Sequence, residues 1–206
     1  NMIKIGKFWF PDQESHFQEQ FYLDEYQIQQ RKTALSHCDN FRTALDIGAH
    51  VGTWTQDLQF YFKRVIAFEP HPKHAECLKK NIDRERVDII QLALGSTRDD
   101  IRVDYNDKSN TGTAAISETG AAAIIVPLDS IQLTNDIDLI KIDVEGYELE
   151  VLKGATETLI NNHPVLNIEI NENSRNLGYG KPEIDSYLEP FGYQYITKVN
   201  NDYIYK

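Results

Sequence analysis

The sequence has few cysteines and no long apolar run. Only two of its 206 residues are cysteine, Cys38 and Cys77, and they lie far apart and match no metal-binding spacing. Two isolated thiols are typical of a reducing compartment, so we expect both to be free and the protein to be cytoplasmic. The most apolar stretch, residues 121–128, is far shorter than the roughly 20 residues that cross a membrane. No membrane span is therefore expected.

Basic residues are also scarce. The chain has 21 Lys and Arg against 32 Asp and Glu, a formal net charge of −11. Binding to a phosphate backbone draws its affinity largely from Lys and Arg, and this balance opposes it. The densest basic patches are Lys79-Lys80 and Arg84-Glu85-Arg86, and an acid interrupts the second one. We expect no nucleic-acid partner.

The length suits one domain with a short appendage. Residues 1–40 are predicted to be a helical lead-in, because Pro11 and Asp12 are helix-start signals and apolar residues follow at helical spacing. Those apolar residues are Phe17, Phe21, Leu23, Tyr26 and Ile28. Residues 41–206 are predicted to form the main domain.

Strand and helix patterns alternate from residue 41 onward, which is typical of a parallel sheet with helical crossovers. Strands are expected at 41–47, 64–69, 87–94, 137–144 and 165–170, and helices at 53–62, 72–82, 148–160 and 182–188. Two further strands, 192–197 and 203–205, flank an Asn-Asn-Asp turn and are expected to be antiparallel. Residues 101–105 and 124–126 resemble short strands around a polar loop at 106–120.

A glycine-bearing turn follows the first of these strands, in the run Asp46-Ile47-Gly48-Ala49-His50-Val51-Gly52. Ligands of parallel sheets bind at this carboxyl edge. Glycine allows the backbone to approach a ligand closely, and the amides of the next helix favour an anion. An acid before the glycines suits a ligand with a positive charge near the turn. The spacing differs from the dinucleotide fingerprint Gly-x-Gly-x-x-Gly.

Two acids end other strands at the same edge. Glu69 follows the second strand, where a carboxylate can accept hydrogen bonds from both hydroxyls of a ribose, or can simply be an exposed strand end. Alternation along residues 140–146 places Lys141, Asp143 and Glu145 on one side of the strand. We interpret Lys141 as the partner of an acid, and Asp143 as a group that reaches the ligand. Glu169 occupies a similar place on the next strand.

Four ordered segments resemble the landmarks of the FkbM-type methyltransferases. They are residues 45–52, Phe68-Glu69-Pro70, Leu128-Asp129-Ser130-Ile131 and the run from Lys141 to Glu148. The resemblance spans about residues 41–172. It implies the class I methyltransferase fold, a Rossmann-like α/β architecture. In that fold a mostly parallel sheet of seven strands has an antiparallel last strand and helices on both faces.

The resemblance also implies a site for S-adenosylmethionine. Asp46, Gly48 and Gly52 would hold its methionine part, in a turn that also includes Ala49 and His50. Glu69 would bind the ribose, Leu92 and Ala93 would lie by the adenine, and Asp143 would face the sulfonium and the acceptor. His50 departs from the family, which commonly has Asn there. The lead-in and the 106–120 loop would shape the acceptor pocket.

The function that follows is methyl transfer to oxygen, on a hydroxyl of a sugar, glycan or small metabolite. Such a hydroxyl benefits from a base, for which Asp143 is the first candidate and Glu145 the second. No resident metal is expected, although a divalent metal bridging Asp143 and Glu169 is an alternative means of activation. Two other hypotheses are a non-catalytic domain that binds S-adenosylmethionine and acts as a partner or scaffold, and a nicotinamide-dependent oxidoreductase. The missing dinucleotide fingerprint opposes the latter.

Overall fold

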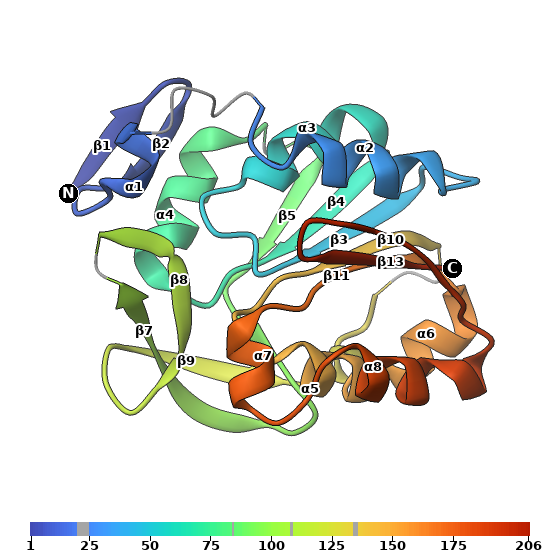
Figure 1. Cartoon of the computed structure of the whole chain (residues 1–206). Helices are drawn as coiled ribbons and strands as arrows, with labels where there is room; N and C mark the ends of the chain where they lie inside the picture. Colours follow the sequence, from blue (N-terminus) through green and yellow to red (C-terminus); the bar gives the residue numbers. More distant parts are fainter. Residues whose placement is uncertain (20–24, 84, 108, 134–135) are drawn as a thin grey trace.

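A seven-stranded sheet forms the centre of the computed structural model, which describes residues 1–19, 25–83, 85–107, 109–133 and 136–206. The strand order is β12-β13-β11-β10-β3-β4-β5 (Figure 1). The strands are β3 (Thr43–Ile47), β4 (Arg64–Phe68), β5 (Val87–Ile90), β10 (Ile137–Ile142), β11 (Val165–Glu169), β12 (Tyr195–Val199) and β13 (Asp202–Tyr205). Neighbours from β11 to β5 pair in parallel, whereas β13 pairs antiparallel with β11 and with β12. The predicted α/β fold with an antiparallel last strand is confirmed.

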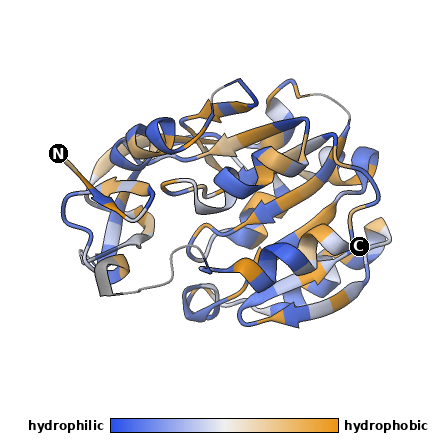
Figure 2. Ribbon diagram, turned by 90° about the horizontal axis from the view of Figure 1, so that it is seen from above, coloured by the Kyte–Doolittle hydropathy of each residue, from blue (hydrophilic) through white to orange (hydrophobic). Residues whose placement is uncertain are grey.

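Helices cover both faces of this sheet because its strands carry apolar side chains on both sides. The helices α2 (Ile28–Ser36), α3 (Thr53–Tyr61) and α4 (Pro72–Asn81) lie on one face. The helices α5 (Glu148–Lys153), α6 (Thr156–Asn162) and α8 (Lys181–Leu188) lie on the other. Along β3, Ala44 packs against the first group and Leu45 against the second. Figure 2 shows the largely apolar central strands between helices that turn hydrophilic residues outward.

The predicted helix at 148–160 is divided in two at Gly154. A Cβ atom at Gly154 would lie 1.9 Å from the carbonyl oxygen of Gly95, so only glycine permits this contact. The second half, α6, begins under the carboxylate of Asp129, which accepts hydrogen bonds from the amides of Glu157 and Thr158 at 2.8 and 2.9 Å. The segment 128–131 thus has a structural role as a helix cap, and its residues Leu128–Ser130 form the short helix η1.

Residues 106–120, predicted to be a polar loop, belong mostly to a second sheet, and that prediction is wrong. This four-stranded sheet has the order β6-β9-β7-β8. Its strands are β6 (Ala93–Leu94), β7 (Asp99–Asp107), β8 (Asn110–Ser117) and β9 (Ala121–Val126). The run of Thr, Ala and Ile in β8 suits a half-buried strand better than a loop. The predicted strand at 87–94 is likewise divided, because β5 ends at Ile90 and β6 joins the other sheet.

The first eleven residues form a β-hairpin, so the predicted helical lead-in is wrong for them. Strand β1 (Met2–Ile5) pairs antiparallel with β2 (Phe8–Pro11). Alternation buries Phe8 and Phe10 against Phe17. The side chain of Asn81 in α4 accepts from the amide of Trp9 at 2.7 Å and donates to its carbonyl at 2.9 Å, which ties the hairpin to the main domain.

The rest of the lead-in is helical in part, with α1 (His16–Glu19) followed by α2. Of the apolar residues predicted to line it, Phe21 and Leu23 lie outside the described residues. The boundary between a lead-in at 1–40 and a domain at 41–206 stays a prediction. Elsewhere the chain forms α7 (Glu172–Asn176) and η2 (Glu189–Phe191).

Both cysteines are free, as predicted. Burial raises the pKa of the Cys38 thiol to about 12 and that of Cys77 to about 11. Within the described ranges, no helix combines the length and the apolar character that crossing a membrane requires.

Candidate active site

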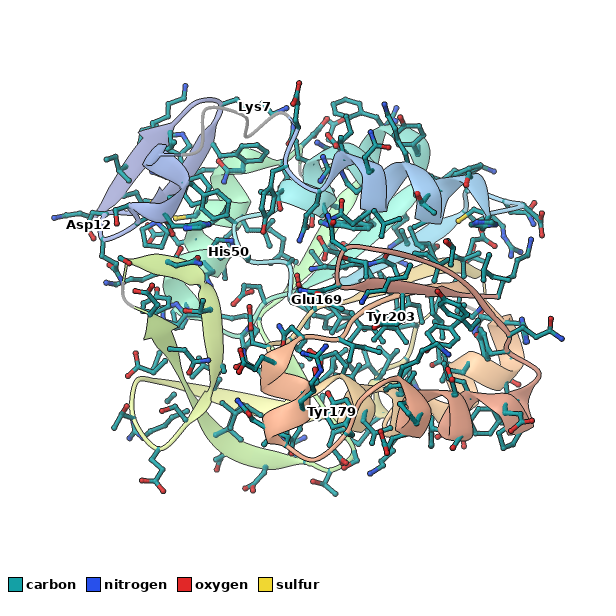
Figure 3. The ribbon with its side chains drawn as sticks, viewed as in Figure 1. Lys7, Asp12, His50, Glu169, Tyr179 and Tyr203 are labelled. Atoms are coloured by element: carbon teal, nitrogen blue, oxygen red, sulfur yellow. The ribbon has the colours of Figure 1, made fainter. Side chains whose placement is uncertain are left out.

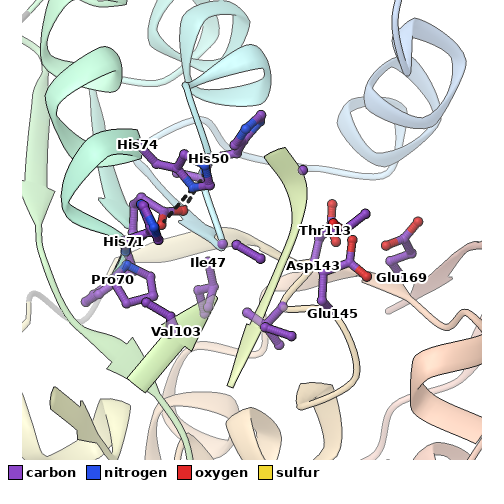
Figure 4. Close-up of a pocket in the computed structure, with 18 of the residues that line it drawn as sticks. Ile47, His50, Pro70, His71, His74, Val103, Thr113, Asp143, Glu145 and Glu169 are labelled. Atoms are coloured by element: carbon purple, nitrogen blue, oxygen red, sulfur yellow. Dashed lines mark hydrogen bonds and ion pairs between the residues drawn. The ribbon is translucent and has the colours of Figure 1, made fainter. Parts of the chain in front are cut away.

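A cavity opens at the carboxyl edge of the central sheet, between the ends of β3, β4, β10 and β11 and the strand β8 (Figure 4). It encloses about 1130 Å³, the solvent at its mouth included. Ten residues were predicted to bind cofactor or catalyse, and eight of them line it: Gly48, Ala49, His50, Glu69, Leu92, Ala93, Asp143 and Glu145. The other two, Asp46 and Gly52, lie behind its wall.

The glycine turn owes its shape to close backbone contact. Gly48 has a φ of +78°, and a Cβ atom there would lie 1.8 Å from the carbonyl oxygen of Asp143. Gly52 has a φ of +96°, and its Cβ would meet Leu78 of α4 at 2.4 Å. Both positions therefore require glycine. Gly48 brings the turn against the end of β10, whereas Gly52 packs the following helix against α4.

Asp46 and Lys141 brace this turn from beneath. Asp46 is fully buried, and its carboxylate accepts a 2.6 Å hydrogen bond from Oγ1 of Thr55 and lies 3.1 Å from Nζ of Lys141. Lys141 also donates to the carbonyl oxygen of Gly48 at 2.7 Å. Burial alone lowers the pKa of Lys141, but Asp46 and Asp143 outweigh it and leave the pKa raised. Lys141 is thus a charged partner of acids, as predicted, and direct contact of Asp46 with a ligand stays a prediction.

Glu69 lies at the cavity wall with its carboxylate held by backbone amides. It accepts hydrogen bonds from the amide of His50 at 2.8 Å and from that of His71 at 2.7 Å. Nδ1 of His74 lies 3.4 Å from the same carboxylate. Burial raises the pKa of Glu69. Each carboxylate oxygen has two lone pairs, so these bonds leave acceptor capacity for a ligand hydroxyl.

Three acids gather at one side of the cavity (Figure 4), and Figure 3 shows the place of one of them, Glu169, in the whole molecule. Carboxylate oxygens of Asp143, Glu145 and Glu169 all lie within 4.8 Å of one another. Burial and the charge of Asp143 raise the pKa of Glu145 to about 7. The charge of Asp143 and burial raise that of Glu169 to about 11. Like charges this close repel one another, which favours a proton on one of them, and Nζ of Lys141 lies 3.7 Å from Asp143 as the cation beside the group.

Amide side chains at the start of α7 hold two members of this acidic group. Asn173 donates to Glu145 at 2.6 Å, and Asn171 donates to Glu145 and to Glu169, each at 3.3 Å. The sequence predicted that Glu169 would occupy a position similar to that of Asp143. It did not predict that the carboxylate of Glu145 would lie close to both. The close approach follows from the backbone after β10, where Glu145 has a left-handed φ of 55°.

Strand β8 and the N-terminal segment complete the opposite wall. Nε2 of His50 lies 2.9 Å from Oγ1 of Thr111, and this hydroxyl donates to the carboxylate of Glu14 at 2.6 Å. Glu14 also accepts from the amides of Thr111 at 2.8 Å and Phe17 at 3.1 Å. Sequence reasoning missed Glu14 and Thr111, which lie 97 residues apart in the chain, and no local pattern marks either of them.

Comparisons with known proteins agree with this geometry. Residues 46–195 match the Methyltransferase FkbM domain. The hexuronic acid methyltransferase AglP of Haloferax volcanii is 33% identical over 120 residues, which are 55% of this chain and 50% of that protein. The chain therefore aligns with about half the length of this curated relative.

Solved structures share the fold. A methyltransferase FkbM from Methylobacillus flagellatus KT has a TM-score of 0.56 and 22% identity, over 80% of this chain and 43% of that one. The N-methyltransferase NodS of Bradyrhizobium japonicum WM9 has a TM-score of 0.53 and 14% identity, over 88% and 92% of the two chains. Since the family match covers most of the chain and includes the glycine turn, Glu69 and the acidic group, this chain belongs to the FkbM methyltransferase family.

Proposed function

We propose that this protein is an S-adenosylmethionine-dependent methyltransferase that methylates a hydroxyl of a sugar, a glycan or a small metabolite. One observation carries the proposal: the family's glycine turn, the acid after β4 and the acid after β10 line a single cavity. Gly48, Ala49 and His50 would hold the amino-acid part of the cofactor. Glu69 would bind its ribose, and Leu92 and Ala93 would flank its adenine.

The residues of the cavity suit an in-line displacement. S-adenosylmethionine supplies a methyl group on a positively charged sulfur, and the protein must align the acceptor oxygen opposite that sulfur. Asp143 directly follows β10; its amide donates to the carbonyl of Ile47 beside the glycine turn, and its carboxylate belongs to the acidic group. Its carboxylate would orient the acceptor hydroxyl and take its proton as the oxygen–carbon bond forms, while the carbon–sulfur bond breaks and S-adenosylhomocysteine leaves. Glu145, beside it, is the second candidate for this role.

The proposal of a sugar acceptor draws support from the relative AglP, whose name identifies hexuronic acid as what it methylates. The lining of the cavity also includes Asn110, Thr113 and Gln27, which offer hydrogen bonds suited to hydroxyl groups. The absence of a nucleic-acid partner remains a prediction, which is based on the net charge of −11. A cytoplasmic location is likewise proposed from the two free thiols.

Calorimetry combined with a methyl-release assay tests this function. The protein is expected to bind S-adenosylmethionine and S-adenosylhomocysteine but not NAD, and to form S-adenosylhomocysteine with glycosides as acceptors. Binding without turnover on any glycoside or metabolite tested would favour the non-catalytic partner domain. Binding of NAD alone would instead identify an oxidoreductase.

The pH dependence of turnover should report the acidic group. We expect kcat/KM to fall as the pH is lowered through about 7, because protonation of Glu145 removes a negative charge beside Asp143 and weakens it as a base. The Glu145→Gln variant should lack this acid limb. An unchanged limb in the variant would assign the titration to another group.

Metal-assisted transfer is the second candidate, because one divalent cation can bridge the carboxylates of Asp143, Glu145 and Glu169. We expect activity to survive dialysis against EDTA, since the family cofactor already brings positive charge to this wall. Loss of activity on chelation, with recovery on adding Mg²⁺ or Mn²⁺, would establish the metal-assisted route instead.

A further inference from the structure

We propose that Nδ1 of His50 accepts a hydrogen bond from the ammonium group at the amino-acid end of the cofactor. Thr111 and Glu14 hold the imidazole in the tautomer that makes this contact possible. The inference rests on the proposed function, and it assigns a binding role to a side chain on the glycine turn and a positioning role to two residues outside the glycine turn.

Hydrogen bonding determines where the proton of the imidazole lies. The hydroxyl of Thr111 has one proton, and it is directed to the carboxylate of Glu14 at 2.6 Å. Oγ1 of Thr111 must therefore accept from Nε2 of His50, which lies 2.9 Å away. Burial, followed by the neighbouring His74, lowers the pKa of His50 well below its ordinary value, so the ring is neutral and has a single N–H group. That group is Nε2–H, and Nδ1 carries a free lone pair.

The ring of His50 packs against Phe17 and His74, which line the cavity with it, and the lone pair of its Nδ1 is available there for a ligand. Nδ1 of His50 has no hydrogen-bond partner among the described residues, and it is not among the polar atoms that the protein encloses without a partner. His50 also lines the cavity, on the turn where the amino-acid part of the cofactor is proposed to lie (Figure 4). Its backbone amide donates to Glu69 at 2.8 Å, which fixes the residue in place.

The surroundings favour a cation as the donor. The carboxylates of Glu69 and Asp143 both act electrostatically on His50, and the positive charge of Lys141 acts against them. The acid that the sequence suggested for a positive ligand, Asp46, is fully buried and bound to Thr55 and Lys141. An ammonium group beside His50 would find both a neutral acceptor and two nearby negative charges. Hydrogen bonds to charged donors are the stronger kind.

Two ligands that differ in the amino-acid part test this assignment without any knowledge of the acceptor. S-adenosylhomocysteine has the ammonium group, whereas 5′-methylthioadenosine lacks the whole amino-acid end but keeps the nucleoside. The variant His50→Phe keeps a ring and removes both nitrogens. We expect it to weaken S-adenosylhomocysteine binding about 10- to 100-fold, the scale of one hydrogen bond to a charged group, and to leave methylthioadenosine binding within about 2-fold.

A second pair of variants tests the positioning residues. Thr111→Val removes the hydroxyl that orients the imidazole and should weaken S-adenosylhomocysteine binding, whereas Thr111→Ser should retain most of the affinity. Equal loss of both ligands in His50→Phe, or full S-adenosylhomocysteine affinity in both His50→Phe and Thr111→Val, would overturn the inference. If His50→Phe fails to fold, the comparison of Val with Ser at position 111 decides alone. Failure of the unaltered protein to bind S-adenosylhomocysteine would contradict the proposed function itself.

Discussion

Asp143→Asn should lower turnover by about 10²- to 10⁴-fold, a far larger effect than its weakening of cofactor binding. The carboxylate lies at the cavity wall, beside the end of β10 and within 4.8 Å of oxygens of Glu145 and Glu169. Orienting an acceptor hydroxyl, or taking its proton, stabilises mainly the transition state. The amide of Asn keeps the shape of the side chain but can neither accept the proton nor carry the negative charge.

If the role of Asp143 is purely structural, the substitution should change stability and not turnover. Its carboxylate also lies 3.7 Å from Nζ of Lys141, and the loss of this ion pair alone would lower the melting temperature and leave turnover of the folded protein nearly normal. Both quantities should be measured on one preparation. Asp138→Asn is a matched control, because Asp138 lies on the same strand and binds Arg42, remote from the cavity. It should affect stability alone.

Glu69→Ala should weaken S-adenosylmethionine binding by about 1.5 to 3 kcal/mol, the scale for hydrogen bonds to a charged group. Glu69 is only 5% exposed at the cavity wall, and two backbone amides already orient its carboxylate. The hydroxyls of a ribose could donate hydrogen bonds to the remaining lone pairs of this carboxylate, which is held in a fixed orientation. The fold should survive, since Glu69 follows the last residue of β4.

Calorimetry on the folded variant checks this assignment. Glu69→Gln, which keeps one oxygen acceptor, should lose less affinity than Glu69→Ala. Asp88→Ala removes an acid from the neighbouring strand β5 that pairs with Arg64 away from the cavity, and should bind the cofactor normally. Unchanged affinity in Glu69→Ala would refute the ribose assignment.

The N-terminal hairpin shows where sequence reasoning failed and why. The strand from Phe8 to Pro11 has only four residues, which is too few to show a clear two-residue alternation of buried and exposed side chains. The helix-start signals at Pro11 and Asp12 therefore favoured a helix in the prediction. The hairpin exists because Phe8 and Phe10 find an apolar partner surface with Phe17 and Cys77. The predicted loop at 106–120 failed similarly, since β8 is a strand through its pairing with β7.

The sequence by itself determined the central sheet, because its five parallel strands are apolar enough to be buried on both faces and each is followed by helix or turn signals. It also indicated which acids would share one edge of the sheet, since Glu69, Asp143 and Glu169 lie at the carboxyl ends of parallel strands. Only the tertiary structure decided which of the acids are buried against other protein groups and which line the cavity. Burial seals Asp46 against Lys141 and Thr55, whereas Asp143 stays at the cavity. The bonds from Glu14 through Thr111 to His50 depend on packing between segments remote in sequence, and no local periodicity encodes such packing.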